Sequence, residues 1–271
     1  MSTIIAVIGA GNIGEALISG LVNSGVNPET ITATNRTEAR RAELAQRYGV
    51  ITTDDNIEAV TDADVCFLCV KPYAIADMIE ELSNAVAAND TSTVLVSMAA
   101  GVTLDAMSEA VSSAGTPLAR VMPNTPMQVG KGVCVVSFGR FVEEDQQELV
   151  TDLLGATGQV VVVPEKLIDA ASAISGSGPA YFFMIAEALV DSGVSLGLPR
   201  DTATALATAT AEGAGAMLAH SGKTPVELRA GVSSPAGTTV AAIRELEESG
   251  VRGAFYRATE AAASRAAEMG T

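Results

Sequence analysis

The chain has 271 residues and carries 16 Lys and Arg against 32 Asp and Glu, a formal net charge of -16. This balance argues against nucleic acid and an anionic membrane surface as partners, because clustered Lys and Arg hold phosphate groups. A hydrophobic content of 48% excludes an acidic disordered chain and is typical of a globular protein with one or two domains.

Short β-branched runs alternate with helical stretches over residues 1–163, a pattern that predicts a mostly parallel sheet covered by helices. Most of these runs are continuously apolar, as in strands that are buried on both faces. The predicted strands are Ile4–Ile8, Thr30–Thr34, Val50–Thr52, Val65–Val70, Val94–Ser97, Leu118–Met122, Val133–Ser137 and Val160–Val163.

A glycine-rich turn follows the first predicted strand and precedes a predicted helix, Glu15–Asn23. Its glycines, Gly9, Gly11 and Gly14, have the G-x-G-x-x-G spacing of dinucleotide-binding folds, in the strand–turn–helix context that this fingerprint needs. The first permits the tight turn, the second lets the backbone approach a pyrophosphate, and the third lets helix and strand pack. Residues 1–163 are therefore predicted to form a Rossmann-type dinucleotide-binding domain.

The end of the second predicted strand indicates which dinucleotide is bound. An NAD-selective site usually places a carboxylate there, whereas this chain has Asn35 and Arg36. Amide and guanidinium groups can bind a 2'-phosphate, so we expect NADP(H), with NAD(H) as the alternative cofactor. The other interpretation of Arg36 is that it only begins the basic stretch that continues to Arg40 and Arg41.

Three later strand ends are expected beside the same cofactor, because ligands of open α/β sheets lie beyond the carboxyl ends of the strands. They are Cys69–Pro72, Ser97–Gly101 and Arg120–Pro126.

Cys66 and Cys69 face opposite ways on a strand, which predicts inert thiols, no metal site and a reducing cytoplasm. The apolar start of the chain is interrupted before signal or membrane length, so we expect a soluble cytoplasmic protein.

The character of the sequence changes after Pro164, where the chain becomes rich in Ala and loses its β-branched runs. Residues 164–271 are predicted to be a second, all-helical domain. The stretch from Pro199 to Leu218 is small and apolar on nearly every side, which is typical of a helix buried all round. We expect a second subunit to cover it.

Two Gly- and Ser-rich segments open helices in this half, Ser175–Tyr181 and Ser233–Thr239. In the second, hydroxyls and amides gather at the start of the predicted helix Val240–Glu248. Such a helix N-terminus can bind a small carboxylate without a basic side chain. Ordinary helix capping by Ser and Thr is the alternative.

These motifs together, over essentially the whole chain, resemble the pyrroline-5-carboxylate reductase family. The resemblance implies a Rossmann domain followed by a helical dimerisation domain, NAD(P)H-dependent reduction of 1-pyrroline-5-carboxylate to L-proline, and a homodimer that can build a larger ring such as a decamer. The cofactor residues that follow from the motifs and the resemblance are Ile8, Gly9, Ala10, Gly11, Asn12, Ile13, Gly14, Asn35, Arg36, Asn56, Cys69, Val70, Lys71, Pro72, Ser97, Ala99 and Ala100.

The resemblance also assigns the substrate to the second motif. It places the carboxylate on the loop from Ser234, mainly at the amides of Gly237 and Thr238, and the ring nitrogen at the catalytic hydroxyl of Thr239. Here the chain departs from the family, which usually has two adjacent glycines where this sequence has Ala236 and Gly237. It also has Leu-Arg-Ala at residues 228–230, where Leu-Lys-Asp is common.

Three other functions fit part of the sequence. A 3-hydroxyacid dehydrogenase relies on a lysine in the helix after its second glycine motif, and about that place holds Phe182 here. A deazaflavin reductase does not account for Ser233–Thr239, and a non-catalytic NADP(H) sensor would bind the cofactor without turnover. The net charge of -16 is expected to reflect an outer surface adapted to a salty cytosol, since the predicted cofactor residues carry no acid.

Overall fold

The computed structural model describes residues 3–269. Its contacts divide the chain into two compact units: residues up to Gly176 together with those from Ala262 onward, and Ser177–Ala261. The domain boundary predicted after residue 163 follows the last strand, whereas residues 164–176 keep their contacts with the first unit. The bounds 1–163 and 164–271 therefore stay a prediction, and their outermost residues lie outside the described chain.

Eight strands form one sheet in the order β3-β2-β1-β4-β5-β6-β7-β8. Their bounds are β1 Ile5–Ile8, β2 Ile31–Thr34, β3 Ile51–Thr53, β4 Val65–Leu68, β5 Val94–Ser97, β6 Leu118–Met122, β7 Gly132–Phe138 and β8 Gly158–Val162. All eight predicted strands are thus confirmed. Their ends move by two residues at most, as at β4, which ends at Leu68 rather than Val70.

The sheet is parallel except at one pair, β6 and β7, which run antiparallel. From β1 the chain first builds outward through β2 to β3 and then returns to place β4 on the other side of β1. The carboxyl ends of β1 and β4 therefore flank the point where the strand order reverses. In open α/β sheets this switch point is where ligands bind.

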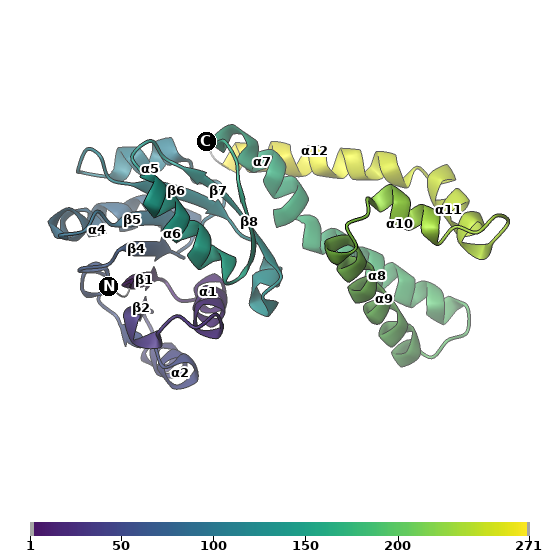
Figure 1. Cartoon of the computed structure of the whole chain (residues 1–271), viewed down its shortest axis with the longest axis horizontal. Helices are drawn as coiled ribbons and strands as arrows, with labels where there is room; N and C mark the ends of the chain where they lie inside the picture. The colour runs from purple at the N-terminus through teal and green to yellow at the C-terminus, as the bar shows by residue number, and fades with distance from the viewer. Residues whose placement is uncertain (1–2, 270–271) are drawn as a thin grey trace. The chain divides into compact units, whose positions relative to one another are not determined.

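Helices cover both faces of the sheet (Figure 1). Their bounds are α1 Asn12–Asn23, α2 Glu38–Tyr48, α3 Asn56–Val60, α4 Ile75–Ala88, α5 Leu104–Ala110 and α6 Glu144–Gly155. Alternate residues of β1 enter opposite cores: Ile5 and Val7 join the one containing α1, α2 and α6, while Ala6 and Ile8 join the one containing α3, α4 and α5. The expected α/β layers are confirmed.

No strand occurs in the described chain after β8, so the predicted helical character of this half is confirmed (Figure 1). The helices are α7 Ile168–Ala171, α8 Gly178–Ser195, α9 Arg200–His220, α10 Pro225–Gly231, α11 Thr238–Glu248 and α12 Val251–Met269. Within the second unit α8 packs along α9. His220 is the last residue of α9, an ordinary place for a basic residue at a helix C-terminus.

The long helices α8 and α9 leave large apolar side chains exposed. Phe182, Phe183 and Met184 are each more than 60% exposed on α8, and Leu206 is 55% exposed on α9. Residues 165–195 form one continuous stretch that is long and apolar enough to cross a membrane by length and composition. Length and composition alone do not identify a membrane span, because a helix face that another subunit covers has the same composition.

Candidate functional site

A cleft of about 780 Å³ opens in the first unit at the carboxyl ends of the parallel strands. It lies where the chain reverses between β1 and β4, and its walls come from the segments after β1, β2, β3, β4 and β5. The residues that line it are Ile8, Gly9, Gly11, Asn12, Ile13, Thr34, Asn35, Arg36, Asp54, Asn56, Cys69, Val70, Lys71, Pro72, Tyr73, Ala74, Met78, Met98, Ala99, Ala100, Met122 and Pro123.

The glycine-rich turn has the geometry that a dinucleotide requires. Gly9 has a φ of +82°, and a Cβ on it would lie 2.8 Å from a methyl carbon of Val70. A Cβ on Gly14 would lie 3.3 Å from Val7, so helix α1 and strand β1 approach closely only because this residue is glycine. A Cβ on Gly11 would meet nothing closer than the Gly9 carbonyl oxygen at 4.0 Å, and α1 begins directly after this residue. The turn therefore combines room for a phosphate with the positive end of a helix.

The end of β2 is tied to this turn by two hydrogen bonds. The Gly9 N–H donates to the Thr34 hydroxyl over 3.1 Å, and the Ala10 N–H donates to the Thr34 carbonyl over 2.8 Å. Thr34 is itself buried. The segment after β2 is thus fixed to the glycine-rich turn after β1.

Three arginines follow β2, and their surroundings differ. Arg36 is exposed and lines the cleft, and its side chain has no hydrogen bond or ion pair among residues 3–269. Arg41 donates to the Asn35 carbonyl over 2.8 Å and pairs with Asp54 at 3.3 Å. Arg40 is not among the residues that line the cleft, and its guanidinium contacts Ala10 and Glu15 of α1. Arg36 is therefore the guanidinium of this segment that is available to a ligand.

Most of the residues predicted to bind cofactor meet in the cleft, but three do not line it. Ala10 is fully buried behind the turn, and Gly14 is used in packing against β1. Ser97 is also fully buried, and its hydroxyl accepts the Ala99 N–H over 3.3 Å, so it shapes the loop after β5 from below.

Several lining residues were not predicted. They are Asp54, Tyr73, Ala74 and Met78, whereas Met98, Met122 and Pro123 come from the strand ends that were expected beside the cofactor. Asp54 could have been found, because it lies two residues after the predicted strand Val50–Thr52, and it brings a carboxylate to the same cleft as Arg36. Tyr73 is 85% exposed and gives the cleft an aromatic side chain. Met78 comes from helix α4, whose contribution depends on packing that strand patterns do not report.

The cysteines have the inert character that the sequence predicts. Burial raises the pKa of the Cys66 thiol and raises the pKa of Cys69 to about 12, so both stay protonated near neutral pH. Within residues 3–269 no group of three or more His, Cys, Asp or Glu side chains is placed to hold a metal ion.

The predicted substrate residues lie in the second unit, at the start of α11. The Gly237 N–H donates to the Ser234 carbonyl over 3.0 Å, which closes a β-turn with Pro235 in its second position. Ala236, in the third position, has a φ of +56°, the left-handed conformation of a type II turn. This position is where the family usually has glycine, so the local backbone keeps a conformation that alanine adopts only with strain.

The turn changes which amides can bind an anion. Because the Gly237 N–H is engaged by Ser234, it is not free in this conformation, contrary to the expectation for it. The N–H groups of the first helical turn have no intrahelical acceptor, and no side chain caps this end of α11. The available donors are therefore those of Thr238, Thr239 and Val240, one residue further on.

Comparisons with known proteins cover the whole chain. Residues 165–269 match the family model for pyrroline-5-carboxylate reductase dimerisation, and residues 4–101 match that for NADP oxidoreductase, coenzyme F420-dependent. A pyrroline-5-carboxylate reductase from Corynebacterium melassecola is 57% identical over 268 residues, 99% of both chains.

Two solved structures are similar over their full length. A pyrroline-5-carboxylate reductase from Coxiella burnetii is 36% identical with a TM-score of 0.95, and the match covers 100% of both chains. The pyrroline carboxylate reductase of Plasmodium falciparum, solved with NADP bound, is 26% identical with a TM-score of 0.85 and covers 99% of this chain and 98% of its own.

Proposed function

The chain belongs to the pyrroline-5-carboxylate reductase family, and we propose that it reduces 1-pyrroline-5-carboxylate to L-proline, the last step of proline synthesis, with NADPH. The observation that carries the proposal is the cleft at the strand switch point, lined by the glycine-rich turn, in a chain 57% identical over nearly its full length to a reductase of this name. The decisive assay follows the loss of NADPH absorbance when pyrroline-5-carboxylate is added.

The cleft fits a dinucleotide on the evidence of its own backbone. A side chain at Gly9 would collide with Val70, and a Cβ on Gly11 would meet nothing closer than the Gly9 carbonyl oxygen at 4.0 Å, so the turn leaves room for a phosphate beside the start of α1. When bound, NADPH supplies the hydride for the reduction. The Gly11 N–H donates to the Gly9 carbonyl over 2.7 Å, so Gly11 would give the pyrophosphate room and the Asn12 N–H at the start of α1 would bind it. Ala99 and Ala100 are small enough to admit the nicotinamide.

The substrate would be held by the start of α11. Its carboxylate would accept hydrogen bonds from the free amides of Thr238, Thr239 and Val240, helped by the positive end of the helix. The Thr239 hydroxyl would bond the ring nitrogen. Since a protonated C=N bond is already electrophilic, the chain needs only to orient the imine carbon toward the hydride and to exclude water. No strong acid or base is required.

NADP(H) is the cofactor of this family, and the preference for it over NAD(H) is part of the proposal. Arg36 supports the preference for NADP(H), because it lines the cleft beside Asn35 and its guanidinium has no hydrogen bond or ion pair among residues 3–269. Asp54 lies on the same wall, but its carboxylate is paired with Arg41 at 3.3 Å, which offsets the charge that would repel a 2'-phosphate.

The alternative functions give different results in the same assay. A 3-hydroxyacid dehydrogenase would oxidise a 3-hydroxy acid with NADP+, yet α8 contains no lysine and exposes Phe182. An NADP(H) sensor would bind the cofactor tightly and turn over neither imine nor oxo acid. Reduction of pyrroline-5-carboxylate, with proline as the product, supports the proposed enzyme against both alternatives.

The family match of residues 165–269 supports oligomerisation through the helical half, and we propose a homodimer that further assembles into a ring such as a decamer. The exposed apolar residues of α8 and α9, such as Phe183 and Leu206, are the surface that the partner would cover. This cover also accounts for the apolar stretch 165–195 without a membrane. Light scattering measures the mass directly; a monomer, or a detergent requirement, contradicts the proposal.

We also propose a cytoplasmic protein whose acidity suits a salty cytosol. Self-repulsion at a net charge of -16 would weaken the folded state at low ionic strength, and molar salt screens it over a few ångströms. The unfolding midpoint should therefore rise between low and molar KCl. A flat or falling midpoint would leave the acidity without this explanation.

A further inference from the structure

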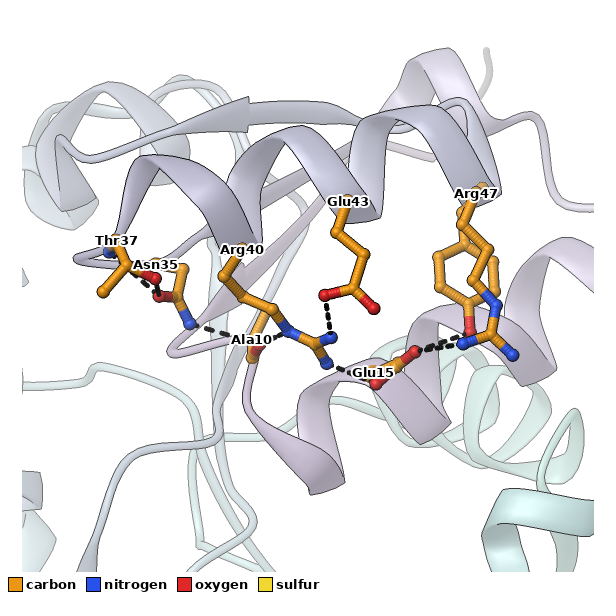
Figure 2. A network of polar contacts seen from close by, with 8 residues as sticks. Ala10, Glu15, Asn35, Thr37, Arg40, Glu43 and Arg47 are labelled. Atoms are coloured by element: carbon orange, nitrogen blue, oxygen red, sulfur yellow. Dashed lines mark hydrogen bonds and ion pairs between the residues drawn. The ribbon is translucent and has the colours of Figure 1, made fainter.

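Arg40 connects three parts of the first unit that are distant in sequence (Figure 2). Its Nε donates to the Ala10 carbonyl over 3.5 Å, in the glycine-rich turn. One terminal nitrogen pairs with Glu15 in the first turn of α1, and the other donates to Glu43 on its own helix over 2.7 Å. The Arg40 side chain is only 21% exposed. A single guanidinium therefore spans from α2 to the turn and to α1.

The Ala10 carbonyl has a second donor from the same region. Asn35 Nδ2 donates to it over 3.3 Å, and Figure 2 shows Asn35 and Arg40 converging on this one oxygen. Because a peptide unit is planar, fixing the carbonyl of Ala10 also fixes the plane that carries the N–H of Gly11. The orientation of the turn at Gly11 is thus set by two side chains, that of Asn35, which lines the cleft, and that of Arg40, which does not.

The Glu15 carboxylate, which pairs with Arg40, is itself held in place by two further donors. Its other carboxylate oxygen accepts Arg47 over 2.9 Å and the Tyr48 hydroxyl over 3.0 Å. The carboxylate stands in the first turn of α1, the helix whose N-terminus faces the place of the pyrophosphate. Its charge there is offset by two guanidinium groups, of which only that of Arg40 also contacts the turn.

We propose that Arg40 is a positioning residue of the cofactor site: aligned by Glu15, it holds the glycine-rich turn in its binding conformation through the Ala10 carbonyl. The inference rests on the proposed function, since it concerns how that cofactor is bound. The inference gives Arg36 and Arg40 different roles. Arg36 discriminates NADP(H) from NAD(H), whereas Arg40 supports the pyrophosphate turn that both cofactors share.

The test measures the Kd of NADP+ and of NAD+ by calorimetry, together with kcat and both KM values. Arg40→Met should weaken both cofactors about tenfold, the scale of one lost charge-assisted hydrogen bond, and leave their ratio and kcat unchanged. Arg40→Lys keeps the positive charge beside Glu15 but lacks the planar guanidinium group. Its Kd for each cofactor should lie between that of the wild type and that of Arg40→Met. Arg47→Met is the matched control, because it also removes a partner of Glu15 but does not touch Ala10.

Three results would overturn the inference. They are an unchanged Kd in Arg40→Met, an equal loss in Arg47→Met, and a loss confined to NADP+, which would make Arg40 a 2'-phosphate ligand. The thermal midpoint of each apoprotein shows whether a variant has lost its fold. If Arg40→Met has lost its fold, the Kd values of Arg40→Lys for NADP+ and NAD+ test the inference instead. If the wild type binds neither dinucleotide, the proposed function fails; if it binds both and the variants match it, only the role of Arg40 fails.

Discussion

Gly14 lies so close to Gly9 that a Cβ atom on it would be 3.2 Å from the Gly9 carbonyl oxygen. This contact joins the first turn of α1 to the end of β1, beneath the wall of the cleft. The packing of α1 on β1 at Gly14 therefore also constrains the turn that lines the cleft.

Gly14→Ala should lower both stability and cofactor affinity, because the added methyl group also meets Val7 and must push α1 away from β1. Overpacking of this kind costs about 1–3 kcal/mol. Chemical denaturation and the Kd of NADP+ measure the two effects. Gly155→Ala is the control: Gly155 ends α6 with open space around it, and the same methyl group should be neutral or stabilising there. Equal effects at both sites would contradict the packing argument.

Arg36→Gln should change the choice of cofactor. The side chain has no partner among residues 3–269, so its loss removes little from the fold, but it removes the charge available to a 2'-phosphate. We expect the KM for NADPH to rise about tenfold or more with the KM for NADH nearly constant, since a charged hydrogen bond contributes about 1.5–3 kcal/mol. A wild-type preference for NADH, or a parallel rise for both cofactors, would contradict the assignment.

Thr239→Val tests the hydroxyl assigned to the ring nitrogen. The variant keeps the shape of the side chain and removes its hydrogen bond, so kcat/KM for the imine should fall by about 1–3 kcal/mol of transition-state stabilisation. Thr239→Ser retains the hydroxyl and should recover most of the activity. Binding of NADP+ should be unaffected in both variants. An unchanged kcat/KM in Thr239→Val would remove this residue from the mechanism.

Ala236→Gly should stabilise the protein. Alanine at a φ of +56° carries a left-handed penalty of about 1–2 kcal/mol, of which the greater freedom of glycine in the unfolded chain offsets a part. We expect a net gain of about 0.5–1 kcal/mol with the turn unchanged. Ala241→Gly, within α11, is the control and should destabilise by about 1 kcal/mol. A loss of stability in Ala236→Gly would show that the strain is not present in solution.

The Glu15 carboxylate should contribute to the loss of stability in acid. Burial raises its pKa, but hydrogen bonds from Arg40 and Tyr48 and the charges of Arg40 and Arg47 outweigh burial and hold it below the ordinary value of 4.5. The stabilisation is therefore fully present above about that pH and is lost as the pH falls through the lowered pKa.

Glu15→Gln should accordingly flatten the acid limb of unfolding free energy against pH and lower stability at neutral pH. Glu43→Gln removes an exposed partner of the same arginine and serves as the control. If the acid limb has the same slope in Glu15→Gln as in the wild type, the ionised network does not stabilise the fold.

The parts of the fold predicted from sequence are those that local patterns determine. Buried strands such as Val94–Ser97 are short runs of mostly apolar residues, and the turn at Gly9 is a short motif between a strand and a helix. The strand ends then had to meet at one edge, because parallel strands place their carboxyl ends together. This reasoning was sufficient to bring Asn35, Lys71 and Ala99 to one cleft.

The features that escaped prediction depend on side-chain packing or on backbone angles. Arg40 contacts Ala10 only because α2 packs beside α1, and no spacing in the sequence encodes that approach. Asp54 follows the third strand, whereas the sequence rule for the choice of cofactor concerns the end of the second strand. The Gly237 amide was expected to be free, but the turn at Ser234 engages it, and only the φ of Ala236 reveals that turn.

The C-terminal part of α12 belongs to the first unit, where Met269 packs so closely on Gly101 that a Cβ there would be 3.0 Å from the Met269 carbonyl oxygen. Gly101 directly follows Ala99 and Ala100 on the cleft wall. During translation this helical segment is synthesised after the whole of Ser177–Ala261. A ribosome-bound chain can therefore form the glycine-rich turn early, yet it completes the packing behind the Ala99–Ala100 wall of the cleft only after the helical unit has been synthesised.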